Sequence, residues 1–180
     1  MKIFFGTKIV GVACLGMCLP LARGQSIWSA PAAKASCGPK NANFDVKLDY
    51  NQPAQPQPVN GKVVIYILQD VNPTYFLSVN SRVGLDGAWV GANRNSSYFG
   101  FTVDPGVHHL CVGVNFQSST SIVLRQLEAK AGATYYFRVQ FLASRGVGGF
   151  LLELEPVDED EGQFLIQTSA HSTSHLKNKH

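Results

Sequence analysis

The stretch VNSRVGLDGAWVG (residues 79–91) contains two strand-like runs on either side of the dipeptide Asp86-Gly87. A two-residue turn of type I′ requires positive φ at both central residues, and Asp-Gly is among the pairs that adopt it most readily. The stretch therefore predicts a β-hairpin, with Val79 to Leu85 leading in and Ala88 to Gly91 returning. It makes a fold built of strands the first hypothesis.

Two runs before this hairpin also indicate strands. Residues 44–50, FDVKLDY, alternate between apolar and charged positions, which is typical of a half-buried strand. Phe44, Val46, Leu48 and Tyr50 are expected on its buried face. Residues 62–70, KVVIYILQD, are apolar on both faces and rich in β-branched side chains, which predicts a central strand. Between them, the proline-rich residues 53–58 predict an extended connector.

The runs after the hairpin are short and are separated by turn signals such as Asp104-Pro105-Gly106 and Ala131-Gly132. In the run 134–142, we expect Tyr135, Phe137, Val139 and Phe141 to face inward. Acidic residues from Asp158 open a short helix that extends to about Gln167, since acidic side chains favour a first helical turn. The expected strands cover residues 98–103, 107–114, 122–129, 134–142 and 150–155.

Eight or nine short strands with regular turns predict an all-β fold. We expect an antiparallel β-sandwich of the immunoglobulin-like or transthyretin-like kind, with a short C-terminal helix. A small barrel is the alternative. The sandwich is expected over residues 44–168, with an extended lead-in at 25–43 and a polar, frayed tail at 169–180.

The composition excludes several other classes. Of the 180 residues, 45% are hydrophobic and 15% are charged, and the chain has 17 glycines and 9 prolines. These values argue against a disordered chain, a coiled coil and a helical bundle rich in Glu and Lys.

Residues 1–24 have the pattern of a secretory signal peptide. Lys2 and Lys8 precede an apolar run from Ile9 to Leu19, and small residues stand before Gln25, the expected first residue of the mature chain. The run is short for a transmembrane anchor, so no transmembrane span is expected in the mature chain. A lipoprotein signal at Cys18 is a further alternative, although Met17 is not the small residue such a site requires. The expected location is periplasmic or extracellular.

Cleavage at this position changes the charge of the chain. The chain has 15 basic and 12 acidic residues, and Lys2, Lys8 and Arg23 lie within the expected signal peptide. The mature chain then has equal numbers of basic and acidic residues. Without a basic excess to neutralise phosphates, nucleic acid is not an expected partner.

The mature chain keeps two cysteines, Cys37 and Cys111. An even count in an exported protein favours a disulfide, and only one pairing is possible. Two buried free thiols are the alternative. Two cysteines so far apart, with no clustered histidine or carboxylate, do not indicate a metal site.

No set of residues indicates catalysis, a cofactor or a metal. His108 and His109 are neighbours on one expected strand, so their side chains point to opposite faces. His171, His175 and His180 lie in the polar tail, and residues 158–161 do not have the ligand spacing of a calcium loop. A Gly-x-Ser-x-Gly elbow is also missing. We therefore expect a protein that is not an enzyme.

Aromatic side chains are the remaining candidates for a binding site. Trp89, Tyr98 and Tyr136, with Phe99 and Tyr135, are expected either to form an exposed platform for a glycan or peptide or to belong to the core of the sandwich.

Three stretches in order resemble one family: residues 61–66, GKVVIY; residues 83–110, which include the Asp-Gly hairpin and DPGVHHL; and residues 129–138, AKAGATYYFR. Together they are similar to the bacterial exported domain-of-unknown-function family 2846, and the hairpin also resembles PEGA-type modules of the cell envelope. The resemblance spans about residues 61–142. It implies export, often as a lipoprotein, and a β-sandwich, but it provides no catalytic residues.

These observations favour an exported, non-enzymatic module of the bacterial cell envelope that binds a protein partner or has a structural role. An unblocked strand edge would be one way to accept a partner. The alternative is a domain that binds a glycan or peptide through exposed aromatic side chains.

Overall fold

The computed structural model describes residues 29–51, 56, 61–71, 79–116, 119–143 and 150–177, and the expected signal peptide lies outside these ranges. The described residues form two helices and ten strands. The helices are α1 (Pro31–Ser36) and α2 (Glu159–Thr168). The strands are β1 (Phe44–Asp49), β2 (Val63–Asp70), β3 (Asn80–Leu85), β4 (Ala88–Arg94), β5 (Ser97–Val103), β6 (Gly106–Phe116), β7 (Ser119–Ala129), β8 (Thr134–Ala143), β9 (Phe150–Val157) and β10 (Ala170–Leu176).

The strands form two sheets that pack face to face, which confirms the all-β sandwich. The larger sheet has the order β1-β10-β5-β2-β8-β9, and the smaller has the order β4-β3-β6-β7. Neighbouring strands are antiparallel except for β2 with β8 and β10 with β5, which are parallel. The expectation of antiparallel pairing is wrong at these two places, because hairpin signals report only on strands adjacent in sequence.

Strand β2 is buried on both faces, as its sequence predicts. Its inward side chains, Val63, Ile65 and Ile67, join the main core between the two sheets. Its outward side chains, Val64, Tyr66 and Leu68, form a second core with residues of α2, β5 and β8. The continuous apolar run of β2 is therefore explained by a helix that covers the outer face of the larger sheet.

The Asp-Gly hairpin is confirmed. Asp86 has φ 49° and Gly87 has φ 85°, so both central residues adopt the positive values that a type I′ turn requires. Leu85 and Ala88 pair on either side of the turn.

The segment 25–43, expected to be extended, contains the helix α1 in its described part. Pro31 occupies the first turn, where a missing N–H is tolerated. The segment lies against the outer face of the smaller sheet: a Cβ atom on Gly84 of β3 would lie 2.7 Å from the carbonyl oxygen of Ser36. Each sheet of the sandwich is thus covered by one helix of the same chain.

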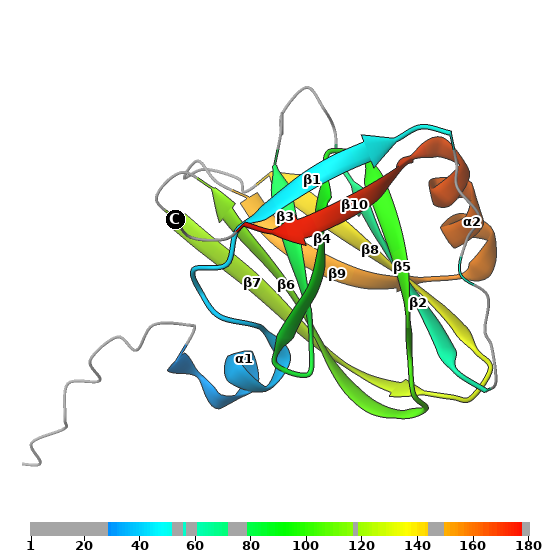
Figure 1. Cartoon of the computed structure of the whole chain (residues 1–180), viewed down its shortest axis with the longest axis horizontal. Helices are drawn as coiled ribbons and strands as arrows, with labels where there is room; N and C mark the ends of the chain where they lie inside the picture. Colours follow the sequence, from blue (N-terminus) through cyan, green and yellow to red (C-terminus); the bar gives the residue numbers. More distant parts are fainter. Residues whose placement is uncertain are drawn as a thin grey trace, which may run out of the picture.

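The expectation of a frayed tail at 169–180 is wrong for residues 170–176, which form β10. Figure 1 shows β1 and β10, from opposite ends of the domain, lying side by side across the sandwich, where they pair from Phe44↔Leu176 to Asp49↔His171. Beyond His171, β10 leaves β5 and approaches the edge strand β4. There the Ser174 hydroxyl accepts a hydrogen bond from the Ala92 N–H at 2.9 Å, and the Ser172 hydroxyl donates to the Ala92 carbonyl at 3.1 Å.

A buried polar network continues from this junction between the sheets. The Asn93 carboxamide oxygen accepts from the hydroxyls of Ser172 at 2.7 Å and Ser97 at 3.3 Å, and its nitrogen donates to the carbonyl of Ile67 at 2.9 Å. Because these polar groups are buried and paired, the loss of one partner would leave another without a hydrogen bond.

One further expectation for β1 is wrong. Phe44 is buried, but Tyr50, expected on the same face, follows the end of the strand and is 76% exposed. Among the described residues, no helix is long and apolar enough to cross a membrane.

Candidate functional site

Two of the three residues expected in an aromatic platform are buried. Tyr98 in β5 is 1% exposed and Tyr136 in β8 is 6% exposed. Both lie under α2, on either side of Tyr66 of β2, whose ring is stacked on that of Tyr136 with centroids 5.3 Å apart. Tyr98 and Tyr136 therefore belong to the second core and cannot contribute to an exposed platform.

Helix α2 holds Tyr136 closely. A Cβ atom on Gly162 would lie 2.4 Å from Cγ of Tyr136, so only a glycine fits at this position. The side-chain nitrogen of Gln163 donates to the Tyr136 hydroxyl at 2.7 Å. Burial, together with smaller contributions from the neighbouring Tyr136 and Tyr98, raises the pKa of Tyr66 to about 12. The tyrosines therefore remain neutral at physiological pH.

The third platform residue, Trp89, lies on the smaller sheet, apart from Tyr98 and Tyr136. Its indole N–H donates to the carbonyl of Pro39 at 2.8 Å, and the guanidinium of Arg82 lies 4.9 Å from its ring centroid. Arg82 in turn donates to the carbonyls of Lys40 and Ala42 at 2.8 Å each. Trp89 and Arg82 thus hold the segment before β1 against the smaller sheet, a structural role that explains their position.

The expected disulfide between Cys37 and Cys111 is present. It joins the end of α1 to the centre of β6, across 74 positions of sequence. Both cysteines are buried. The bond fixes the same segment that Trp89 and Arg82 hold.

His108 and His109 are separated by strand alternation, as predicted. His108 is the more buried, with its side chain 14% exposed. Its Nδ1 lies 2.6 Å from a carboxylate oxygen of Asp86, and its Nε2 lies 2.8 Å from the carbonyl oxygen of Asp104. An Asp-His pair resembles part of a catalytic triad, but a general base needs a free ring nitrogen. Both ring nitrogens of His108 are occupied within the fold, which favours a structural role.

The histidines of the tail lie on β10. His171 packs edge-on against Tyr98 with ring centroids 5.4 Å apart, and burial lowers its pKa despite the opposing effect of Asp49. His175 pairs with Asp45 across the β1–β10 ladder, and His180 lies outside the described residues. The part of the chain that the structure describes contains no group of three side chains suited to holding a metal.

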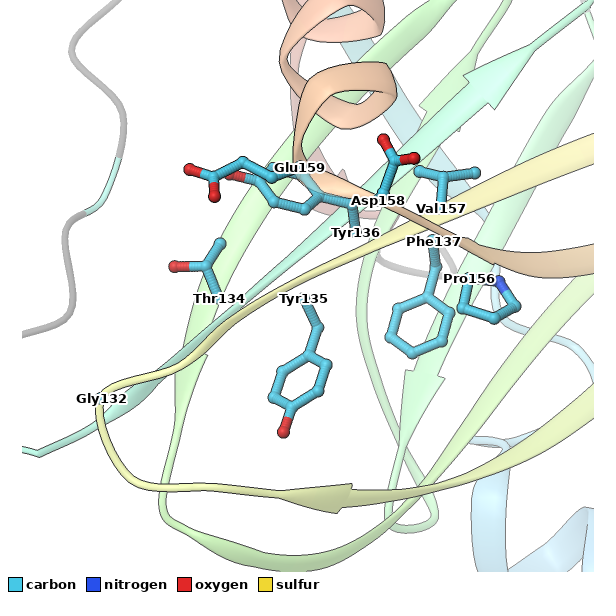
Figure 2. A pocket seen from close by; sticks show the side chains of 9 residues that line it. All are labelled: Gly132, Thr134, Tyr135, Tyr136, Phe137, Pro156, Val157, Asp158 and Glu159. Atoms are coloured by element: carbon cyan, nitrogen blue, oxygen red, sulfur yellow. The ribbon is translucent and has the colours of Figure 1, made fainter.

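A cleft of about 460 Å³ lies where β9 ends and α2 begins. Figure 2 shows its lining, which comes from the start of β8 on one side and from the β9–α2 junction on the other. The lining residues are Gly132, Thr134, Tyr135, Tyr136, Phe137, Pro156, Val157, Asp158 and Glu159.

The backbone of β8 is open at this cleft. The Ala133 carbonyl accepts from the Val64 N–H at 3.0 Å and so points toward β2, while the Ala133 N–H donates to the Lys130 carbonyl at 3.1 Å within the turn. Because successive strand residues alternate in direction, the N–H and C=O of Thr134 point the other way, toward β9. The ladder with β9 begins only at Tyr136↔Val157. Among the described strands, none continues it to Thr134.

The cleft carries negative charge on the α2 side. Asp158 caps the helix, with a carboxylate oxygen accepting from the Glu161 N–H at 2.9 Å. Glu159 is exposed beside it. Burial is the main reason that the pKa of Tyr136 is raised; the hydrogen bond from Gln163 opposes this effect, and the charge of Glu159 adds to it. The nearby Arg138 pairs with Glu155 at 2.9 Å and with Glu161, so its charge is already compensated. Asp158 and Glu159 therefore make the lining acidic.

The cleft is not indicated by the sequence. A helix start at Asp158 and Glu159 and a strand at Thr134 are both confirmed, but nothing in either pattern indicates that the two meet. The available signal was Pro156, which lacks an N–H and is typical of an edge strand.

Comparisons of the chain with protein-family models, with curated proteins and with solved structures give no match.

Proposed function

We propose that the mature chain is an exported, non-enzymatic β-sandwich module of the bacterial cell envelope that binds a protein partner along an open strand edge. The observation that carries this proposal is the backbone of Thr134, which faces a cleft where β9 has ended. A partner segment that continues the line of β9 beside Thr134 would supply the missing hydrogen bonds, and the addition of an extended segment to a strand edge is a common mode of peptide recognition.

Export is supported by two independent features. The first 24 residues have the pattern of a signal peptide. The disulfide between Cys37 and Cys111 suits an oxidising compartment, where such bonds persist. Mass spectrometry of the protein from its native host tests this part: we expect a chain that begins at Gln25 and gains two hydrogens on reduction.

Binding rather than catalysis is supported by the contacts of the side chains that most resemble catalytic groups, because these side chains already bond or pack within the fold. His108 has both ring nitrogens engaged by Asp86 and Asp104. The aromatic side chains of Tyr98 and Tyr136 belong to the second core. The strand edge at the cleft is the surface that we propose for a partner.

Site-specific cross-linking tests the binding site. A photoreactive amino acid is placed at Thr134 in the full chain, and at Gln126, an exposed residue of β7, as the matched control. After irradiation of the native envelope fraction, we expect a discrete cross-linked protein from position 134 and not from position 126. No cross-linked species, or the same species from both positions, would contradict the proposal.

A further inference from the structure

We infer that the partner segment carries a lysine or arginine side chain, which lies against Asp158 and Glu159 while its main chain pairs with Thr134. This inference rests on the proposed function and specifies the chemistry of the partner: an extended, basic peptide segment. It combines the open backbone of β8 with the charge on the facing wall of the cleft.

The geometry of strand pairing places this side chain. A segment antiparallel to β8 would continue the line of β9, with one residue directly opposite Thr134. Side chains of directly opposed residues lie on the same face of a sheet. Thr134 and Tyr136 share a face by alternation, and α2 covers that face at Tyr136, where the charge of Glu159 is felt. The side chain opposite Thr134 therefore points toward the start of α2.

The electrostatics of the cleft select a cation for this position. The N-terminus of a helix carries about half a positive charge, which by itself would favour an anion. Residues 158–161 supply four carboxylates, of which Glu161 is paired with Arg138. The other three carboxylates together carry more negative charge than the partial positive charge at the N-terminus of the helix can offset. Asp158 and Glu159 line the cleft directly, and a lysine or arginine would complement them.

The size of the cleft agrees with one side chain and its flanking backbone. Its volume of about 460 Å³ lies at the lower end of the range for ligand pockets, roughly 300–1,000 Å³. Figure 2 shows the side chains of Asp158 and Glu159 on the helix side of the cleft. The long stem of a lysine opposite Thr134 would extend toward them.

Peptide titration followed by amide NMR tests the inference. The probe is a mixture of capped pentapeptides with lysine at the centre and Val, Thr or Ile at the other positions. Its control is the same mixture with norleucine, which keeps the four-carbon stem without the charge. We expect the lysine mixture to shift the amide signals of Thr134, Tyr136 and Glu159, with an affinity about tenfold above that of the norleucine mixture.

Variants of the helix start separate charge from folding. Glu159→Gln is expected to weaken binding of the lysine mixture roughly fivefold. Asp160→Asn, one residue further along the same exposed turn and outside the cleft lining, is expected to weaken it much less. For the backbone contact, Thr134→Pro removes the open N–H and should abolish binding, whereas Thr134→Val keeps it. Circular dichroism of each variant verifies that the fold is retained.

The outcomes distinguish the inference from the proposed function. Equal binding of the lysine and norleucine mixtures, or no shifts at the cleft with either, would overturn the preference for a cation. If position 134 still cross-links to a discrete partner in that case, the module binds there through other chemistry. If cross-linking fails at position 134 as well, the proposed binding edge itself is wrong.

Discussion

His108 connects two turns of the sandwich through one side chain. One ring nitrogen contacts Asp86 in the β3–β4 turn, and the other contacts the carbonyl of Asp104 in the β5–β6 turn. Asp86 also accepts from the backbone N–H of His109 at 2.8 Å, and Asp104 pairs with Lys62 at 2.5 Å. Since both acceptors suit N–H groups, the doubly protonated ring fits the site best.

These contacts shift two pKa values in opposite directions. Burial alone would lower the pKa of His108, but its hydrogen bonds and the negative charges of Asp86 and Asp104 raise it above the ordinary 6.5. Burial alone would raise the pKa of Asp86, but the contacts with His108 and His109 lower it below the ordinary 3.8. The histidine contribution to stability is full below its unfolded pKa and is lost as pH rises through its folded pKa. The aspartate contribution is lost as pH falls through its own folded pKa.

A substitution at His108 should therefore have a pH-dependent cost. We expect His108→Gln to lower the free energy of unfolding by about 1 kcal/mol at pH 5.5, a modest value because Asp86 is partly exposed and screened by solvent. At pH 9, where less of the native histidine is protonated, the loss should be smaller. Urea unfolding at both pH values measures the difference. His109→Gln measures the smaller contribution of the second histidine, whose Nδ1 lies 3.8 Å from the same carboxylate. Equal losses for His108→Gln at the two pH values would contradict the role of the charge.

At the scale of elements, β10 joins both sheets through serine hydroxyls. We expect Ser172→Ala to lower the free energy of unfolding by about 1–3 kcal/mol, because Asn93 and the Ala92 carbonyl would lose a buried hydrogen bond. Thr173→Ala, on the exposed face of the same strand, should change it by less than about 0.5 kcal/mol. Chemical denaturation of the two variants provides the comparison, and similar losses for both would show that β10 is not fastened by Ser172.

The packing of helix α2 is tested by the sign of the stability change in Gly162→Ala. Alanine stabilises most helices relative to glycine by about 1 kcal/mol. At Gly162 we expect the opposite, a loss of roughly 1–3 kcal/mol, because the added methyl group would overlap the Tyr136 ring. A thermal melt of Gly162→Ala decides: a higher Tm than the parent would mean that the helix does not pack so closely on the ring.

The elements that could be predicted from the sequence are those whose own pattern specifies them. The run of β2 and the Asp86-Gly87 turn are examples, because apolar continuity and positive φ are local properties. Strand β10 could not be predicted because its inward positions are Ala170, Ser172 and Ser174, which form no apolar pattern, and the two serines bond to β4. The burial of Tyr98 and Tyr136 could not be predicted either, since alternation indicates which face a side chain takes but not what covers that face.

At the scale of the whole molecule, the disulfide connects the N-terminal segment to the centre of the smaller sheet. We expect its reduction to lower the free energy of unfolding by about 2–4 kcal/mol, mainly because the unfolded chain gains freedom. Guanidinium unfolding with and without reductant measures the change, and Cys37→Ser/Cys111→Ser is the matched variant. An unchanged midpoint would mean that Arg82 and Trp89 hold the segment without the covalent bond.

The cleft at the end of β9 also depends on the arrangement of the whole molecule. Thr134 and Glu159 are 25 positions apart in sequence, and they meet only because β9 returns along β8 and stops at Val157. No periodicity in either segment indicates the meeting point. The charge of residues 158–161 could be predicted from the sequence, whereas the open backbone opposite it required the register of the sheet.

The pairing of β1 with β10 has a consequence for the order of events during biosynthesis. β10 contains the last described strand residues of the chain, and it completes the contacts of β1, of β4 and of the buried amide of Asn93. A nascent chain lacks all of these contacts until residues 170–176 have been synthesised. The partners that β10 finds in β1, β4 and Asn93 must therefore wait for it after the rest of the described sandwich has been made.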